Sequence, residues 1–88
     1  MKYENMESRV AFLKKALVTT GVDWNENVLK NLTVVVFAYE NAVDKDPGFV
    51  AWLTMKECEK MGLEFNLTLT MKAVFWLEIF EFALKGGK

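Results

Sequence analysis

The sequence predicts an all-α protein: a compact four-helix domain made of two tandem helical hairpins, with a period of about 41 residues and pseudo-twofold symmetry. Three observations predict it. Apolar residues recur every three or four positions along four segments. Residue types typical of helix ends separate these segments. The pentapeptide Gly-Val-Asp-Trp-Asn at 21–25 is also matched at 62–66 by Gly-Leu-Glu-Phe-Asn, which has the same classes of residue in the same order.

The first predicted helix covers residues 3–20, and Gly21 follows it directly. A glycine just past a helix commonly takes the left-handed conformation that ends it. The spacing of the apolar residues places them on one face, which we expect to be buried. That face consists of Met6, Val10, Leu13 and Leu17.

A second helix is predicted to run to about Val43. Asp23 and Glu26 have the spacing of a capping box, and Asn25 is a competing N-cap. The expected core positions follow the same helical spacing as before. They are Val28, Leu32, Val35, Val36, Tyr39 and Val43.

A turn at 44–48 separates the two hairpins. Asp46 can cap a third helix and Pro47 can occupy its first position, because proline lacks the amide that a helix start leaves unused. This helix ends near Met61, and Gly62 closes it as Gly21 closes the first. A fourth helix is predicted over residues 66–85, although alternating polar and apolar residues over 63–71 also fit a short strand.

The internal repeat favours the helix for this last segment. The offset that carries Gly21 onto Gly62 pairs each expected core position of the second helix with an apolar residue of the fourth. Upstream, Val-Ala-Phe-Leu at 10–13 resembles Val-Ala-Trp-Leu at 50–53. The second copy then has one more residue than the first between this segment and its glycine. A hairpin of this length cannot bury its apolar face alone. We therefore expect hairpins at about 3–44 and 46–86 to pack together as a single domain, 1–88.

The predicted core stripe of the fourth helix consists of Leu69, Ala73, Trp76, Leu77, Phe80, Ala83 and Leu84. The helix also carries apolar residues that this stripe does not explain. They form a second stripe, made of Met71, Phe75, Ile79 and Phe82. The same offset relates them to a milder and more polar set in the second helix: Lys30, Val34, Ala38 and Asn41. Three interpretations remain open, in which the helix is the buried hub of the fold, forms a homodimer interface or offers a site to another protein.

Two residues of the second helix, Val34 and Phe37, also project away from its core stripe. They are weaker candidates for a contact. The candidate protein-binding residues are thus Met71, Phe75, Ile79, Phe82, Val34 and Phe37.

The composition argues against common enzymatic sites. The chain has no histidine, the usual general base near neutral pH and a frequent zinc ligand. Neither Ser8 nor Cys58 therefore has an imidazole to activate it. Glu78 and Glu81 share a helical face away from the predicted core stripe, where solvation is the ordinary explanation. We expect no catalytic, cofactor-binding or metal-binding residues.

The remaining expectation is a small non-enzymatic protein–protein interaction module: a homodimer, or a stoichiometric binder or inhibitor of a cytoplasmic protein. One cysteine and no long apolar N-terminal stretch fit the cytoplasm. No segment has the roughly 20 apolar residues of a membrane span. The alternative is a helical nucleic-acid-binding regulator, but a net charge of -1 and few basic residues on the hairpin helices argue against it.

Overall fold

The computed structural model describes the backbone of residues 2–84 and 86, and the side chains from Met6 onward within that range. It confirms the all-α prediction, with four helices and no strand among the described residues. They are α1 (Lys2–Thr19), α2 (Glu26–Asn41), α3 (Pro47–Met61) and α4 (Leu67–Leu84). The strand alternative for 63–71 is therefore wrong.

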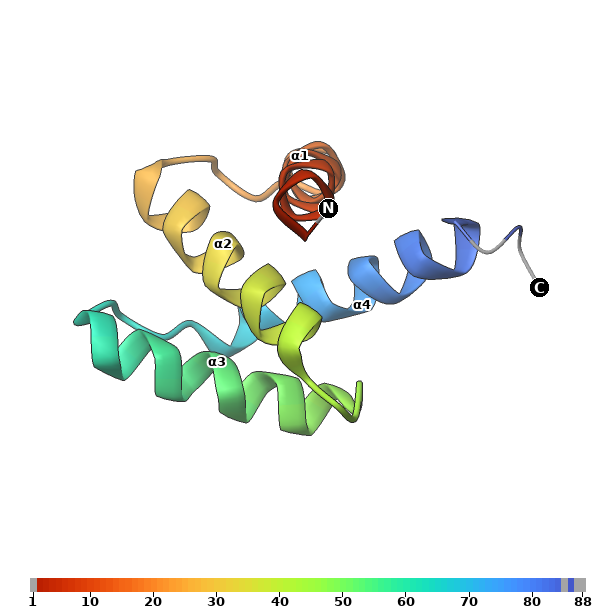
Figure 1. The fold of residues 1–88 in the computed structure, drawn as a ribbon. Coiled ribbons are helices and arrows are strands. Elements are labelled where there is room, and N and C mark those ends of the chain that lie inside the picture. The colour runs from red at the N-terminus through yellow and green to blue at the C-terminus, as the bar shows by residue number, and fades with distance from the viewer. Residues whose placement is uncertain (1, 85, 87–88) are drawn as a thin grey trace.

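Two central helices and two outer helices make up the domain. In Figure 1, α2 crosses α4 at the centre, with α1 on one side of this pair and α3 on the other. Each outer helix contacts both central helices, while α1 and α3 do not contact each other within the described chain. This arrangement is what two hairpins related by a pseudo-twofold axis would give. The repeat itself stays a prediction.

The C-terminal ends of α1 and α3 close with the same hydrogen bond, at positions that the predicted repeat relates. The amide of Val22 donates to the carbonyl of Leu17, and that of Leu63 to the carbonyl of Cys58, both at 2.9 Å. The glycine before each donor has a positive φ, of 95° and 70°. Both glycines thus end helices in the left-handed conformation predicted for them.

The N-terminal ends of α2 and α4 are capped by asparagines. Asn25 Oδ1 accepts from the amide of Val28 at 2.9 Å, and Asn66 Oδ1 from the amide of Leu69 at 3.0 Å. These bonds satisfy amides that a helix start leaves without a partner. Asn25 is thus the N-cap of α2, and the competing capping box at Asp23 is wrong.

Between the hairpins, the turn has the predicted cap. The side chain of Asp46 accepts from the amide of Phe49 at 3.1 Å, and Pro47 begins α3.

None of the described helices combines the length and apolar character needed to cross a bilayer.

The core lies where the outer helices meet the α2–α4 pair. Thr54 and Thr70 lie buried there, and each donates its hydroxyl to a carbonyl four residues earlier, at 2.8 Å. The most deeply buried large apolar side chains are Leu13, Leu17, Leu32, Val35, Val36, Val50, Val74 and Leu77.

Predicted core positions fail at the ends of the two central helices. Helix α2 ends at Asn41, so Val43 lies beyond it and is fully exposed. Ala83 and Leu84, in the last turn of α4, are also exposed. That turn extends away from the other helices (Figure 1). Helical spacing assigns a face to these residues, but no helix packs over that face at the end of the hairpin.

Candidate protein-binding surface

The second apolar stripe of α4 lies on the protein surface. We call it the α4 stripe, and its residues are between 39 and 58% exposed. They are Met71, Phe75, Ile79 and Phe82. The interpretation of α4 as a helix buried on all sides is therefore wrong, because one long side of it faces solvent.

The rest of α4 belongs to the core. Its buried face packs toward the other three helices and contains Leu69, Thr70, Ala73, Val74 and Leu77. The stripe is longer than the sequence predicts, since Leu67, four residues before Met71, is exposed on the same side of α4. Leu84 is exposed too, but it lies nine residues after Phe75 and therefore on the side of the helix opposite the stripe. Leu84 was expected in the core, whereas Leu67 was not assigned to either stripe. Two charged residues of opposite sign, Lys72 and Glu78, are exposed on the same side of the helix.

An aromatic cluster between α1 and α4 packs against the stripe. Phe12 of α1 packs against Trp76 with ring centroids 6.2 Å apart and against Phe80 at 4.7 Å. Phe75 of the stripe meets Trp76 edge-on at 5.7 Å. Aromatic pairs in these geometries add to the stability given by burial alone. The centre of the stripe is thus anchored to packed side chains.

The matching face of α2 is buried. Val34 and Ala38, the counterparts of Phe75 and Ile79, are only 5% and 3% exposed. This corrects the prediction that Val34 projects away from the core. The cause is α3, because Val34 lines a cavity together with Glu57 and Met61 of that helix. Phe37 does project outward and is exposed, as predicted.

A groove runs between α2 and α3. Its two cavities, of about 280 and 420 Å³, share Thr33, Val34 and Met61. Leu29 and Leu63 line one end, and Met6 of α1 and Phe37 line the other. The groove thus spans residues 29–37 of α2, which corresponds to about 12 Å at 1.5 Å per residue.

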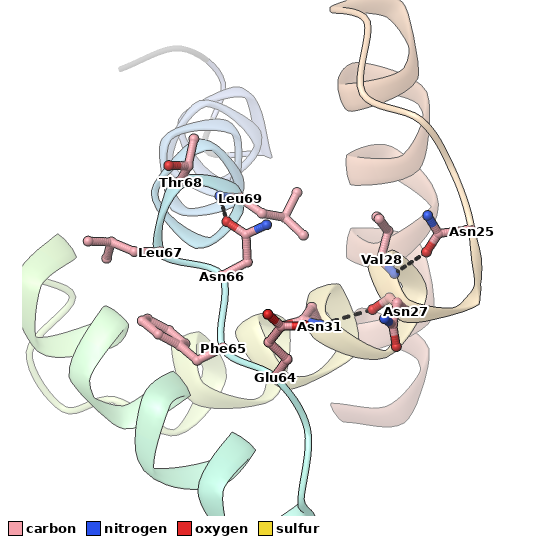
Figure 2. Close-up of a pocket in the computed structure, with 10 residues that line it drawn as sticks. All are labelled: Asn25, Asn27, Val28, Asn31, Glu64, Phe65, Asn66, Leu67, Thr68 and Leu69. Atoms are coloured by element: carbon pink, nitrogen blue, oxygen red, sulfur yellow. Dashed lines mark hydrogen bonds between the residues drawn. The ribbon is translucent and has the colours of Figure 1, made fainter.

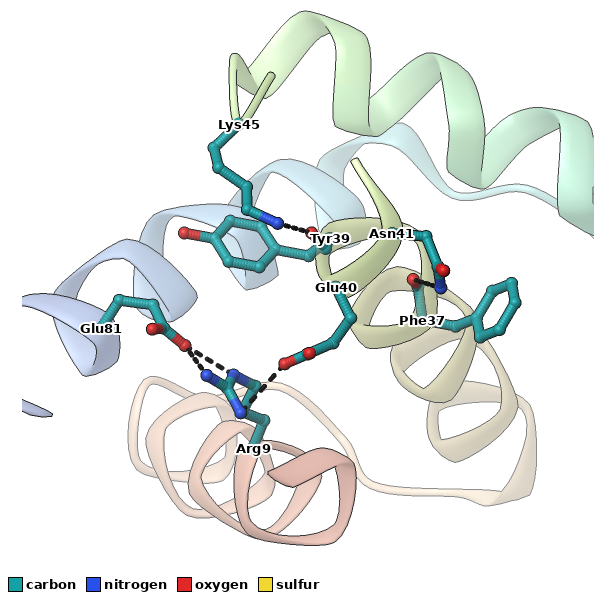
Figure 3. A network of polar contacts seen from close by, with 7 residues as sticks. All are labelled: Arg9, Phe37, Tyr39, Glu40, Asn41, Lys45 and Glu81. Carbon is teal, nitrogen blue, oxygen red and sulfur yellow. Dashed lines mark hydrogen bonds and ion pairs between the residues drawn. The ribbon is translucent and has the colours of Figure 1, made fainter. Parts of the chain in front are cut away.

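Arg9 forms an ion cluster that the sequence did not predict. It is 8% exposed and pairs with one glutamate from each central helix (Figure 3). Its Nη1 lies 2.9 Å from Glu40 Oε2 of α2, and its Nε lies 2.6 Å from Glu81 Oε2 of α4, which also contacts Nη2. The guanidinium lies 5.7 Å from the ring centroid of Phe80. A signal was present, because Arg9 interrupts an apolar face and the repeat offset carries one glutamate onto the other.

Tyr39 lies beside this cluster. Burial raises the pKa of its phenol above the ordinary value of 10.0, and the negative charges of Glu81 and Glu78 act in the same direction. Lys45 donates to the Tyr39 carbonyl, and its ammonium lies 4.8 Å from the centroid of the Tyr39 ring (Figure 3). These contacts tie the turn between the hairpins to the end of α2.

A polar cavity of about 400 Å³ lies between the N-terminal ends of α2 and α4 (Figure 2). Both capping asparagines, Asn25 and Asn66, line it, and the Asn31 amide donates to the Asn27 carbonyl at 3.0 Å. In the part of the chain that the structure describes, each buried side-chain nitrogen or oxygen has a hydrogen-bond partner. The cavity therefore has no buried polar group that requires a ligand.

Among the residues described, no group of three or more histidine, cysteine, aspartate or glutamate side chains is placed to hold a metal ion. Comparisons with known proteins add no assignment: no family model, no curated protein and no solved structure matches the chain. The α4 stripe is therefore the candidate site that this chain's own residues define.

Proposed function

We propose that the chain is a non-enzymatic protein–protein interaction module that acts as a homodimer in the cytoplasm, with the α4 stripe as its contact surface. One observation carries the proposal. Four large apolar side chains are exposed in a row on α4, whereas the matching positions Val34 and Ala38 of α2 are buried, with Val34 beside Glu57 and Met61 of α3.

The composition of the surface supports binding. Small monomers rarely expose a continuous apolar patch of more than a few hundred Å² unless it is functional. Aromatic residues and methionine are enriched in the buried centres of protein interfaces. The α4 stripe contains two phenylalanines and one methionine, and Leu67 extends it at the N-terminal end of the helix.

The available area supports a second copy as the partner. Five large apolar side chains, the four of the stripe and Leu67, present roughly 100 Å² each, so two copies would bury on the order of 1,000 Å², the smallest area expected of a specific interface. The charged neighbours Lys72 and Glu78 cancel, so two copies meet without net repulsion.

The solution mass tests the proposal. Light scattering coupled to size exclusion should give twice the chain mass of 10.1 kDa for the wild type. The double variant Phe75→Glu/Phe82→Glu should run as a folded monomer, because two carboxylates at a buried interface lack partners. Val43→Glu is the matched control, since Val43 is fully exposed outside the stripe, and it should remain dimeric.

The outcomes distinguish a second copy of the chain from a different protein as the partner of the stripe. A monomeric wild type at all accessible concentrations would contradict the homodimer and leave a different protein as the occupant of the stripe. A double variant that loses its helical circular dichroism would show that the stripe contributes to the fold instead.

A further inference from the structure

We infer that the dimer closes through the same face of both copies, so that the α4 stripe of one chain packs on the α4 stripe of the other with Phe75 at the centre. This inference rests on the proposed homodimer. It adds which surface of the second copy covers the stripe, and it implies that assembly stops at two chains.

The spacing along α4 is suited to pairing with itself. Phe75 is the most exposed residue of the stripe, and Met71 and Ile79 lie four residues before and after it. Residues four apart form a continuous ridge on a helix. A twofold interface must be self-complementary, and this ridge has an apolar residue at equal distances on both sides of its centre.

The charges around the ridge are also balanced about Phe75. Lys72 lies three residues before it and Glu78 three residues after it, and both are exposed. Steps of three residues in opposite directions place them on opposite flanks of the ridge. Each copy therefore brings one charge of each sign to the rim, outside the apolar centre.

A helix already covers the matching face elsewhere in the molecule. On α2, Val34 lies under α3, and Asn31 contacts Cys58 of α3 at 3.9 Å. The counterparts of Asn31 and Val34 are Lys72 and Phe75 of α4. On α4 the corresponding outer helix, α1, makes contact but leaves Phe75 exposed, so a helix from the second copy would complete the cover of this face.

The groove between α2 and α3 is the other apolar surface that a second copy could offer. Packing a stripe into a groove would join two different faces and build a ring or an open chain of molecules. The groove spans about 12 Å of α2, whereas the stripe from Leu67 to Phe82 spans about 23 Å. Much of the stripe would remain exposed in such an assembly, so the paired stripes bury more apolar area.

Opposite charges at the centre test the inference. Phe75→Lys and Phe75→Glu should each be monomeric, because like charges would meet across the twofold axis. An equimolar mixture should regain a mass near twice 10.1 kDa, because lysine then faces glutamate. Met61→Glu alters only the groove and should remain dimeric.

A second measurement does not depend on these charged variants folding. Phe75→Cys should form a covalent dimer under mild oxidation, since a disulfide needs Cα atoms within about 7 Å. Val43→Cys is the control and should remain uncrosslinked. Cys58 is buried and present in both variants, so it does not distinguish them.

The results separate this inference from the proposed function. A monomeric wild type would overturn both. A dimeric wild type would keep the function and overturn the inference if the mixture stayed monomeric, if Met61→Glu dissociated the protein, or if Phe75→Cys failed to crosslink.

Discussion

Helices α2 and α4 occupy equivalent central places in the fold, yet their matching faces have opposite environments. Val34 and Ala38 of α2 are buried, with Val34 beside α3, while Phe75 and Ile79 of α4 face solvent. The smaller side chains are buried and the larger ones are exposed, the reverse of what hydrophobic burial within one chain would select. The difference shows that exposure depends on which helix packs alongside, and it identifies α4 as the helix with an uncovered apolar side.

The largest expected effect comes from placing a charge at the two matching positions, Val34 and Phe75. Val34→Glu should destabilise the domain by about 3 kcal/mol or more, because it places an unpaired charge in the core. Phe75→Glu, at the matching position, should change the stability of the monomer by less than about 1 kcal/mol. Urea unfolding at a concentration where both variants are monomeric measures the contrast. Equal losses would show that the two faces are equally buried.

The Arg9 cluster gives the next largest effect. The double variant Glu40→Gln/Glu81→Gln should cost about 3 kcal/mol, because it leaves a buried guanidinium without its two carboxylate partners. Each single variant should cost less than half of that, since one carboxylate remains. Chemical denaturation of the three variants provides the measurement. A double variant as stable as the wild type would show that the ion cluster does not stabilise the fold.

The two asparagine caps test the repeat at a finer level. Asn25→Ala and Asn66→Ala should each cost about 1 kcal/mol, since each removes one capping hydrogen bond. If the hairpins are equivalent, the two losses should agree within error. Asp23→Ala is the control for the competing cap, and it should leave the unfolding midpoint nearly unchanged.

The smallest effect concerns pH. Burial raises the pKa of Tyr39 above 10.0 in the folded protein, so the unfolded chain loses this proton first. The stability contributed by the neutral phenol is present below pH 10 and is lost as pH rises through the folded pKa. Tyr39→Phe should therefore flatten the fall in the unfolding midpoint above pH 10. Phe occupies the counterpart position, at Phe80, which cannot titrate.

A second titrating group, the Cys58 thiol, must be removed from the pH experiment. Burial also raises the pKa of the Cys58 thiol, with a smaller contribution from Glu57, so Cys58 adds its own alkaline dependence. Comparing Tyr39→Phe with the wild type in a Cys58→Ala background removes it. Identical alkaline slopes in the two proteins would exclude Tyr39 as a source of the effect.

Local features were predictable because they depend on neighbours in the sequence. Asp46, Pro47 and the two glycines mark helix ends through bonds to residues within five positions. The apolar stripe of α4 could be recognised in the same way. Its exposure could not, because only the placement of α1 and α3 decides which sides of a central helix are covered.

The features that the sequence did not predict depend on contacts between helices. The sequence predicts Val34 outside the core because helical spacing does not reveal how much of α2 the neighbouring helix α3 covers. The cluster of Arg9, Glu40 and Glu81 joins residues up to 72 positions apart, so no local pattern contains it. The repeat offset alone relates the two glutamates, and a single arginine does not reveal that both would meet it.

Arg9 also has a consequence for which hairpins can pair. Its counterpart in the second hairpin under the predicted repeat is Phe49, so the described residues place one buried cation beside the two glutamates that the repeat relates. Two second hairpins from different molecules would bring two copies of Glu81 together without an arginine, and two first hairpins would bring two arginines together. Only a first hairpin packed against a second hairpin balances the charge, so the cluster disfavours the association of two like hairpins from different chains.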